Sequence, residues 1–96
     1  QYISLLFEDK KNKTIAYFNF QKKGIRVDFS RGNVYTDGRT SKNYFILDDP
    51  KKIAKEDSWT WKSGAKGTVY KVSIFKDTDI DYIMFLIKQK YKNLRQ

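Results

Sequence analysis

The stretch TIAYFNFQKKGIRVDFS, residues 14–30, decides the fold because apolar and polar side chains alternate on both sides of a glycine turn. One face of each extended segment is therefore apolar: Ala16, Phe18 and Phe20 before the turn, and Ile25, Val27 and Phe29 after it. Arg26 and Asp28 point to the other face. Gly24 follows two lysines and can adopt the positive φ that a tight turn needs. The stretch predicts a β-hairpin.

Further strands are expected on both sides of this hairpin. Residues 2–7 form a short apolar run that ends in the polar turn 8–13, and residues 68–75 alternate with Tyr70, Val72 and Ile74 on one face. Residues 31–43 contain two glycines and many polar side chains, which predicts a loop, with a small extra hairpin at Val34 and Tyr35.

Two helices are expected in the second half of the chain. Asp49 is a suitable N-cap and Pro50 suits the first helical position, so a short helix is predicted from Pro50 to about Glu56. Asp77 or Thr78 is expected to cap a long terminal helix. Its predicted buried stripe has the helical period and comprises Ile80, Ile83, Met84, Ile87 and Tyr91.

These elements predict the α+β class. We expect a small, mostly antiparallel sheet of about four strands, one short helix, and a long C-terminal helix packed on one face of the sheet. Charge is spread evenly along the chain and no composition break divides it, so residues 1–96 are expected to form a single domain. Because the chain begins with Gln1, we expect it to be part of a longer protein.

Composition excludes several kinds of chemistry. The chain contains 20 Lys and Arg against 11 Asp and Glu, a formal net charge of +9, and it has no His and no Cys. Thiol nucleophiles, Ser-His-Asp triads and the usual zinc sites are therefore excluded. We expect no enzymatic activity, no cofactor, no bound metal and no membrane span, and a cytoplasmic location.

The acidic clusters give no strong sign of catalysis or metal binding. Asp77, Asp79 and Asp81 are expected at a helix N-terminus, where carboxylates complement the helix dipole. A calcium loop starting at Asp77 would need glycine and glutamate where the chain has Tyr82 and Lys88. Asp48 and Asp49 are explained in the same way, as caps.

Several short segments, taken in this order, resemble a known family. They are QKKGIRV at residues 21–27, LDDPK at 47–51, DIDYI at 79–83 and LIKQKY at 86–91. They are similar to an uncharacterised bacterial and archaeal domain family, usually found at the C-terminus of proteins described as "predicted transport protein". The likeness covers most of residues 14–92. That domain often follows a restriction-endonuclease-like part or a nuclease module used against modified phage DNA. The resemblance implies that residues 1–96 are the C-terminal part of a longer protein. It also implies an accessory role beside nucleic acid, in contact with the other domains of the parent protein.

The basic composition suggests where DNA or RNA would bind. Cations interleaved with aromatic side chains suit phosphate contacts and base stacking, and one segment combines them: Lys52, Lys55, Trp59, Trp61, Lys62 and Lys66. A secondary basic patch is expected at the hairpin tip, formed by Lys22, Lys23 and Arg26. The competing interpretation is that the lysines are merely solvated and the tryptophans cap the core. We therefore expect a non-enzymatic accessory domain that assists nucleic-acid engagement; the alternative is a protein-interaction or oligomerisation module.

Overall fold

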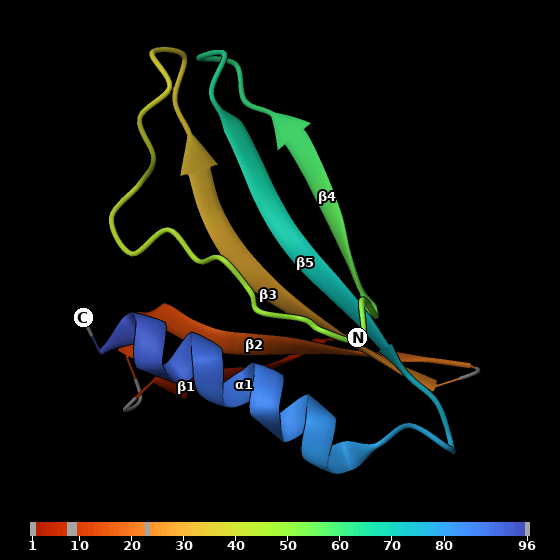
Figure 1. The fold of residues 1–96 in the computed structure, drawn as a ribbon. Coiled ribbons are helices and arrows are strands. Elements are labelled where there is room, and N and C mark those ends of the chain that lie inside the picture. The colour runs from red at the N-terminus through yellow and green to blue at the C-terminus, as the bar shows by residue number, and fades with distance from the viewer. Residues whose placement is uncertain (1, 8–9, 23, 96) are drawn as a thin grey trace.

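The described part of the chain folds into one antiparallel sheet and one helix (Figure 1). The computed structural model describes residues 2–7, 10–22 and 24–95. The elements in chain order are β1 (Tyr2–Phe7), β2 (Lys10–Gln21), β3 (Gly24–Val34), β4 (Ala54–Thr60), β5 (Lys66–Ile74) and α1 (Ile80–Leu94). The strands lie in the order β1-β2-β3-β5-β4. The predicted α+β class, the antiparallel sheet and the C-terminal helix are confirmed.

Two parts of the expected architecture are wrong. The sheet has five strands rather than about four, and the short helix predicted from Pro50 to Glu56 does not form. Pro50 and Lys51 make only a turn, and Lys52 adopts a left-handed backbone conformation with φ of 54°. A residue in that conformation ends a right-handed helix. The chain then becomes extended and pairs along the free edge of β5 as β4.

The hairpin predicted over residues 14–30 forms between β2 and β3. Phe18 pairs with Val27, and Gln21 pairs with Gly24 at the turn. Gly24 has a φ of 156°, and a Cβ built on it would lie 2.5 Å from the carbonyl oxygen of Ile74. The close approach of β5 therefore requires glycine at this position.

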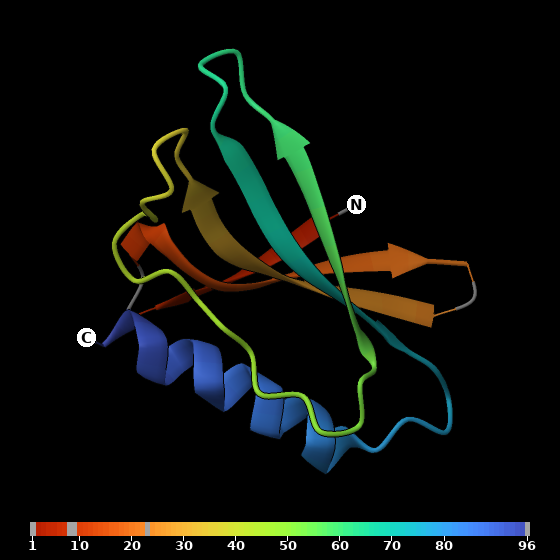
Figure 2. The ribbon, with the colours of Figure 1, turned by 45° about the horizontal axis from the view of Figure 1, so that its top comes forward.

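The core lies between one face of the sheet and α1, and the segment 44–53 passes along the same side (Figure 2). Val27, Phe29 and Val72 supply fully buried side chains from the sheet, as Leu86 does from α1. Phe45, from the segment that joins β3 to β4, packs edge-on against Tyr70 at 5.9 Å between ring centroids. This connecting segment is therefore an integral part of the core.

The buried stripe of α1 differs from the predicted one. Ile83 is buried and Ile87 partly buried as expected, but Ile80, Met84 and Tyr91 are exposed. The residues that face the core are Ile83, Leu86, Lys90 and Leu94, which also follow the helical period. The sequence conceals this stripe because one of its members is a lysine, a residue type that is usually solvated.

Strands β2 and β3 separate halfway along their length. Their pairing runs from the turn to Tyr17 and Asp28, after which β2 pairs only with β1 and β3 only with β5. The carbonyl oxygen of Ser30, on the freed edge of β3, accepts a hydrogen bond of 2.7 Å from Lys90 Nζ. Lys90 is only 5% exposed, and burial lowers the pKa of its ammonium group from 10.5 to about 8.

The packing of α1 generates a stability prediction. Leu86→Ala should lower the free energy of unfolding by about 2–5 kcal/mol, since it removes a fully buried side chain and leaves a cavity. Met84→Ala is the matched control on the exposed side of the same helix, and it should cost less than about 1 kcal/mol. Urea denaturation followed by circular dichroism measures both values. Equal losses in the two variants would contradict the packing described for α1.

The buried ammonium of Lys90 generates a prediction about pH. Below pH 8 this lysine is protonated in both states, and the folded state bears the cost of the buried charge. Between pH 8 and 10.5 the unfolded chain binds more protons, so this group makes stability rise with pH, by no more than about 3 kcal/mol. Lys90→Met removes this titrating group. The free energy of unfolding of the parent should therefore rise relative to that of Lys90→Met between about pH 7 and about pH 9.5. A difference between the two proteins that does not change with pH would contradict the burial of a charged Lys90.

Candidate nucleic-acid interface

The face of the sheet opposite the core, called here the open face, carries a row of polar side chains. Residues paired across neighbouring strands share a face, and successive pairs join β1 to β4 in one line. The row comprises Ser4, Tyr17, Asp28, Lys71 and Lys55. Its neighbours in sequence on β3 and β5, among them Val27 and Val72, point into the core. The open face is thus separate from the packing interior.

The central charges of the open face are neutralised within the sheet. Arg26 donates from two nitrogens to the Asp28 carboxylate, at 2.8 and 2.9 Å. Lys71 donates to Asp57 at 2.8 Å, and this hydrogen bond is the main cause that lowers the pKa of the Asp57 carboxyl. The guanidinium of Arg26, a residue predicted as part of a basic patch, is therefore paired with the Asp28 carboxylate. Of the two other members of that patch, Lys22 is exposed at the turn and Lys23 lies outside the described residues.

Two tryptophans lie together at one end of the open face. Trp59 is on β4 and Trp61 just beyond it, with ring centroids 5.5 Å apart in an edge-to-face arrangement. Trp59 covers Gly67 on the neighbouring strand, where a Cβ would overlap the indole. The Trp61 indole N–H donates to Asn33 Oδ1 at 3.3 Å. The rings remain 43% and 47% exposed, so neither tryptophan caps the core.

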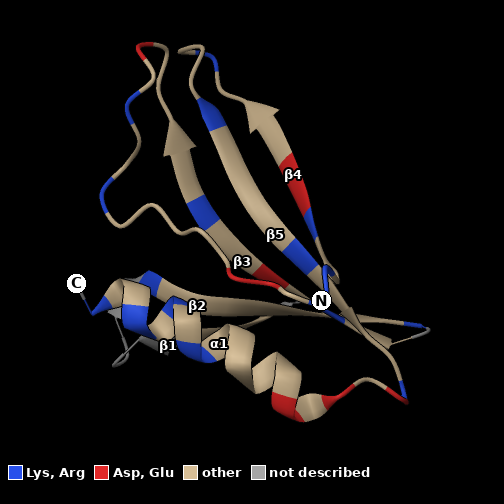
Figure 3. Ribbon diagram, viewed as in Figure 1, with Lys and Arg blue, Asp and Glu red and all other residues tan. Residues whose placement is uncertain are grey.

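The lysines predicted beside the tryptophans fall into two groups. Lys62 lies in the β4–β5 turn, next to Trp61 in the chain. Lys66 begins β5 opposite Thr60, one position before Gly67, so it lies at the same end of the sheet as the tryptophan pair but on the other face of its strand. Lys55 lies at the other end of β4, and Lys52 precedes that strand. Five residue steps along the strand separate Lys55 from Thr60, a distance of about 17 Å. Figure 3 shows that basic residues also occupy the C-terminal half of α1, where they complement the helix dipole.

A groove on the open face connects Trp59 with β2. Its volume is about 630 Å³, and its lining includes Tyr17, Trp59 and Val69 beside the paired charges of Arg26, Asp28 and Lys71. Sequence reasoning missed Tyr17 and Val69 as site residues. Their positions opposite Asp28 and Ser30 follow from strand register, which long-range pairing sets and local sequence does not reveal.

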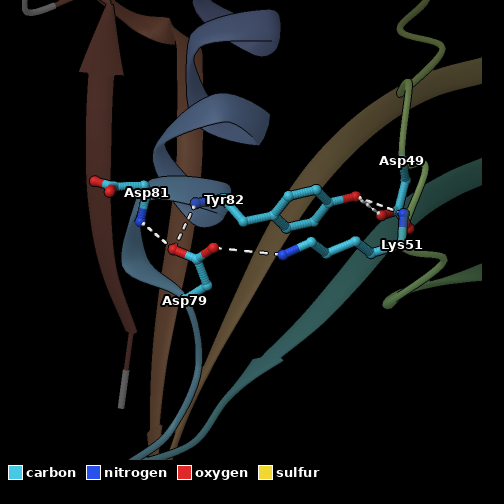
Figure 4. Close-up of polar contacts among 5 residues, drawn as sticks. All are labelled: Asp49, Lys51, Asp79, Asp81 and Tyr82. Carbon is cyan, nitrogen blue, oxygen red and sulfur yellow. Dashed lines mark hydrogen bonds and ion pairs between the residues drawn. The ribbon is translucent and has the colours of Figure 1, made fainter.

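The aspartates near α1 hold the chain segment before β4 against the helix (Figure 4). Asp49 accepts hydrogen bonds from the Ala54 N–H, at 2.8 Å, and from the Tyr82 hydroxyl. Burial, followed by this bond to Asp49, raises the pKa of Tyr82. The backbone N–H of Lys51 donates back to the Tyr82 oxygen at 3.0 Å. The Asp49 carboxylate, predicted to cap a helix, instead ties a turn to α1.

Asp79, rather than Asp77 or Thr78, is the N-cap of α1. One of its oxygens accepts from the backbone N–H groups of Asp81 and Tyr82, at 3.0 and 3.3 Å, and the other meets Lys51 Nζ at 3.4 Å. The bond from Tyr82 N–H is the first of the causes that lower the pKa of Asp79. Within the described part of the chain, no three His, Cys, Asp or Glu side chains are grouped so that they could hold a metal ion.

Comparison of the chain with protein-family models, curated proteins and solved structures finds no match. Among the described residues, no helix combines the length and the apolar character that crossing a bilayer requires. The family resemblance of the motifs thus stays a prediction, and the case for function depends on the geometry of the open face.

Proposed function

We propose that this chain is a non-enzymatic domain that binds nucleic acid weakly and without sequence preference, as an accessory part of a larger defence or restriction-type protein. The observation that carries the proposal is the exposed Trp59–Trp61 pair on the open face, with Lys62 in the adjoining turn and Lys66 at the same end of the sheet. The defence context is supported only by the resemblance of the sequence motifs.

The tryptophan pair has the properties of a stacking platform. Its edge-to-face packing, the seat of Trp59 on Gly67 and the hydrogen bond from Trp61 to Asn33 limit the motion of both rings. A base that stacks on such a ring loses little affinity to ordering the side chain. Because every base has a π-face, stacking tolerates any sequence, and it favours single strands, whose bases are free.

Phosphate contacts would come from the lysines at the same end of the sheet. Lys62 and Lys66 are exposed, and neither forms an ion pair with a described carboxylate. The net charge of +9 adds a general attraction to polyanions. The groove that runs from Trp59 to Tyr17 offers a continuous path for a strand across the open face. Lys52 and Lys55, at the other end of β4, would meet phosphates farther along a bound strand.

A protein-interaction role is the second candidate. Several large apolar side chains outside the open face are about half exposed: Ile3, Phe20, Phe75, Ile80 and Met84. Apolar surface of this kind is typical of protein interfaces. Binding there would depend little on salt, whereas phosphate binding weakens steeply as salt rises, which distinguishes the two candidates.

The proposed function is tested with a fluorescein-labelled thymidine 12-mer and fluorescence anisotropy. The parent protein should bind with micromolar or weaker affinity at about 50 mM salt and lose affinity as salt rises. Lys62→Glu with Lys66→Glu should weaken binding about tenfold. The control double variant, Lys76→Glu with Lys88→Glu, makes the same charge change at exposed positions away from the tryptophans. Equal losses in the two double variants, or no binding by the parent, would contradict the proposal.

Stacking is tested separately with Trp61→Ala. Because Trp61 is half exposed and lies outside the core, thermal melts should show the variant folded. Its affinity for the single strand should fall at least about fivefold, and its affinity for a 12-base-pair duplex much less. Equal losses for single strand and duplex would show that Trp61 does not stack on bases.

A further inference from the structure

A second cavity lies where β2 and β3 separate. It has a volume of about 490 Å³ and is lined from four directions: by Thr14 and Tyr17 of β2, Ser30 and Arg31 of β3, Lys42 of the following loop and Lys90 of α1. The sequence places these residues far apart, and none of them belongs to the tryptophan group. The cavity is distinct from the proposed stacking site, although Tyr17 and Ser30 line both this cavity and the open-face groove.

The walls of this cavity are cationic. Lys13, Arg31, Lys42 and Lys90 all line it, and no described lining residue is acidic. Lys90 is 5% exposed; its Nζ donates to Ser30 O and lies 5.1 Å from the Phe45 ring centroid. No carboxylate among residues 2–7, 10–22 and 24–95 forms an ion pair with Lys90 or Lys42. A buried ammonium without a counterion is costly, and a bound anion would remove that cost.

Arg31 adds a fixed positive charge to the cavity wall. Its guanidinium carbon lies 5.0 Å from the ring centroids of both Tyr44 and Tyr70, and one terminal nitrogen donates to Glu56 at 3.0 Å. These contacts fix the position of the guanidinium. Its Nε is buried without a hydrogen-bond partner among the described residues, so the charge is incompletely compensated within the protein. A bound anion in the cavity would be attracted by this charge.

We propose that this cavity binds a phosphate group carried by a larger molecule. A phosphate monoester presents three acceptor oxygens and nearly two negative charges, which suits several ammonium and guanidinium donors that converge from different elements. A carboxylate would supply fewer acceptors and one charge. The cavity is much larger than a phosphate group alone, so it leaves room for the attached molecule. That molecule is either a small phosphate ester or the phosphorylated end of a nucleic-acid strand that continues past Tyr17 into the open-face groove.

Calorimetric titration of the protein with inorganic phosphate, at constant ionic strength, tests the site. The parent should show saturable binding, and Lys42→Gln should weaken it about three- to tenfold because an exposed wall cation is lost. Lys76→Gln is the matched control: an exposed lysine outside the cavity, whose loss should change affinity less than about twofold. Lys90→Met should weaken binding at least as much as Lys42→Gln, with thermal melts to show that it is folded. Lys42→Gln carries the test if Lys90→Met does not fold.

Two results would overturn the proposal. One is the absence of saturable binding by the parent at phosphate concentrations up to about 20 mM, which corresponds to an affinity too weak for a built site. The other is equal weakening of phosphate binding by Lys42→Gln and Lys76→Gln, which would show that binding depends only on the net charge of the protein. Trp61→Ala should leave phosphate binding unchanged, so failure of the stacking site and failure of this cavity give different patterns.

Thymidine hexamers with and without a 5′-phosphate distinguish the two sources of the phosphate. If the phosphorylated hexamer binds about tenfold tighter and Lys42→Gln removes that advantage, the site accepts a strand end. If the two hexamers bind equally while inorganic phosphate binding stays sensitive to Lys42→Gln, the site accepts a small phosphate ester. Both outcomes support the phosphate site.

Discussion

The separation of β2 from β3 after the Tyr17–Asp28 pair is the constraint on which the remaining structure depends, because it leaves part of β3 without a partner on one side. Buried backbone groups must be hydrogen-bonded, and three different solutions meet that need. Lys90 donates to the Ser30 carbonyl, the Phe45 N–H donates to Arg31 O at 2.8 Å, and Ser41 pairs with the backbone of Asn33. The first of these hydrogen bonds buries a cation, and the second brings Phe45 into the core. The cationic cavity and this part of the core therefore both result from the separation of β2 from β3.

The segment that leaves β3 is held in turn by α1. Gln89 forms two hydrogen bonds of 2.8 Å with the backbone of Asp48, and Tyr82 binds Asp49 and the backbone of Lys51. The LDDPK stretch and α1 are thus held together by this set of hydrogen bonds. The Asp49 carboxylate and the Tyr82 hydroxyl are engaged there, on the side of the sheet that holds the core. Trp59 and Trp61 are exposed on the open face, on the other side of the sheet.

The elements that could be predicted are those that depend on short-range features of the sequence. The β2–β3 hairpin and α1 were predictable because alternation around Gly24 and the acidic first turn of the helix are short-range signals. Strand β4 was not, since the edge sequence AKEDSWT has no apolar alternation and most of its residues are exposed. That error also affected the site: the predicted helix ends near Glu56, before the tryptophans, whereas β4 is extended throughout and separates Lys55 from Trp59 by about 13 Å. The cationic cavity escaped prediction because only the parting of two strands brings Arg31 and Lys90 together.

Nuclear magnetic resonance mapping with an unlabelled thymidine hexamer distinguishes a nucleic-acid-binding open face from a structural opposite side. If the open face binds the strand, the largest chemical-shift changes should fall on the indole N–H groups of Trp59 and Trp61 and on the amide of Gly67, which lies under Trp59. The amides of Met84 and Phe85, exposed on α1, should hardly move. Changes concentrated on α1, with both indole signals unmoved at saturation, would contradict the account.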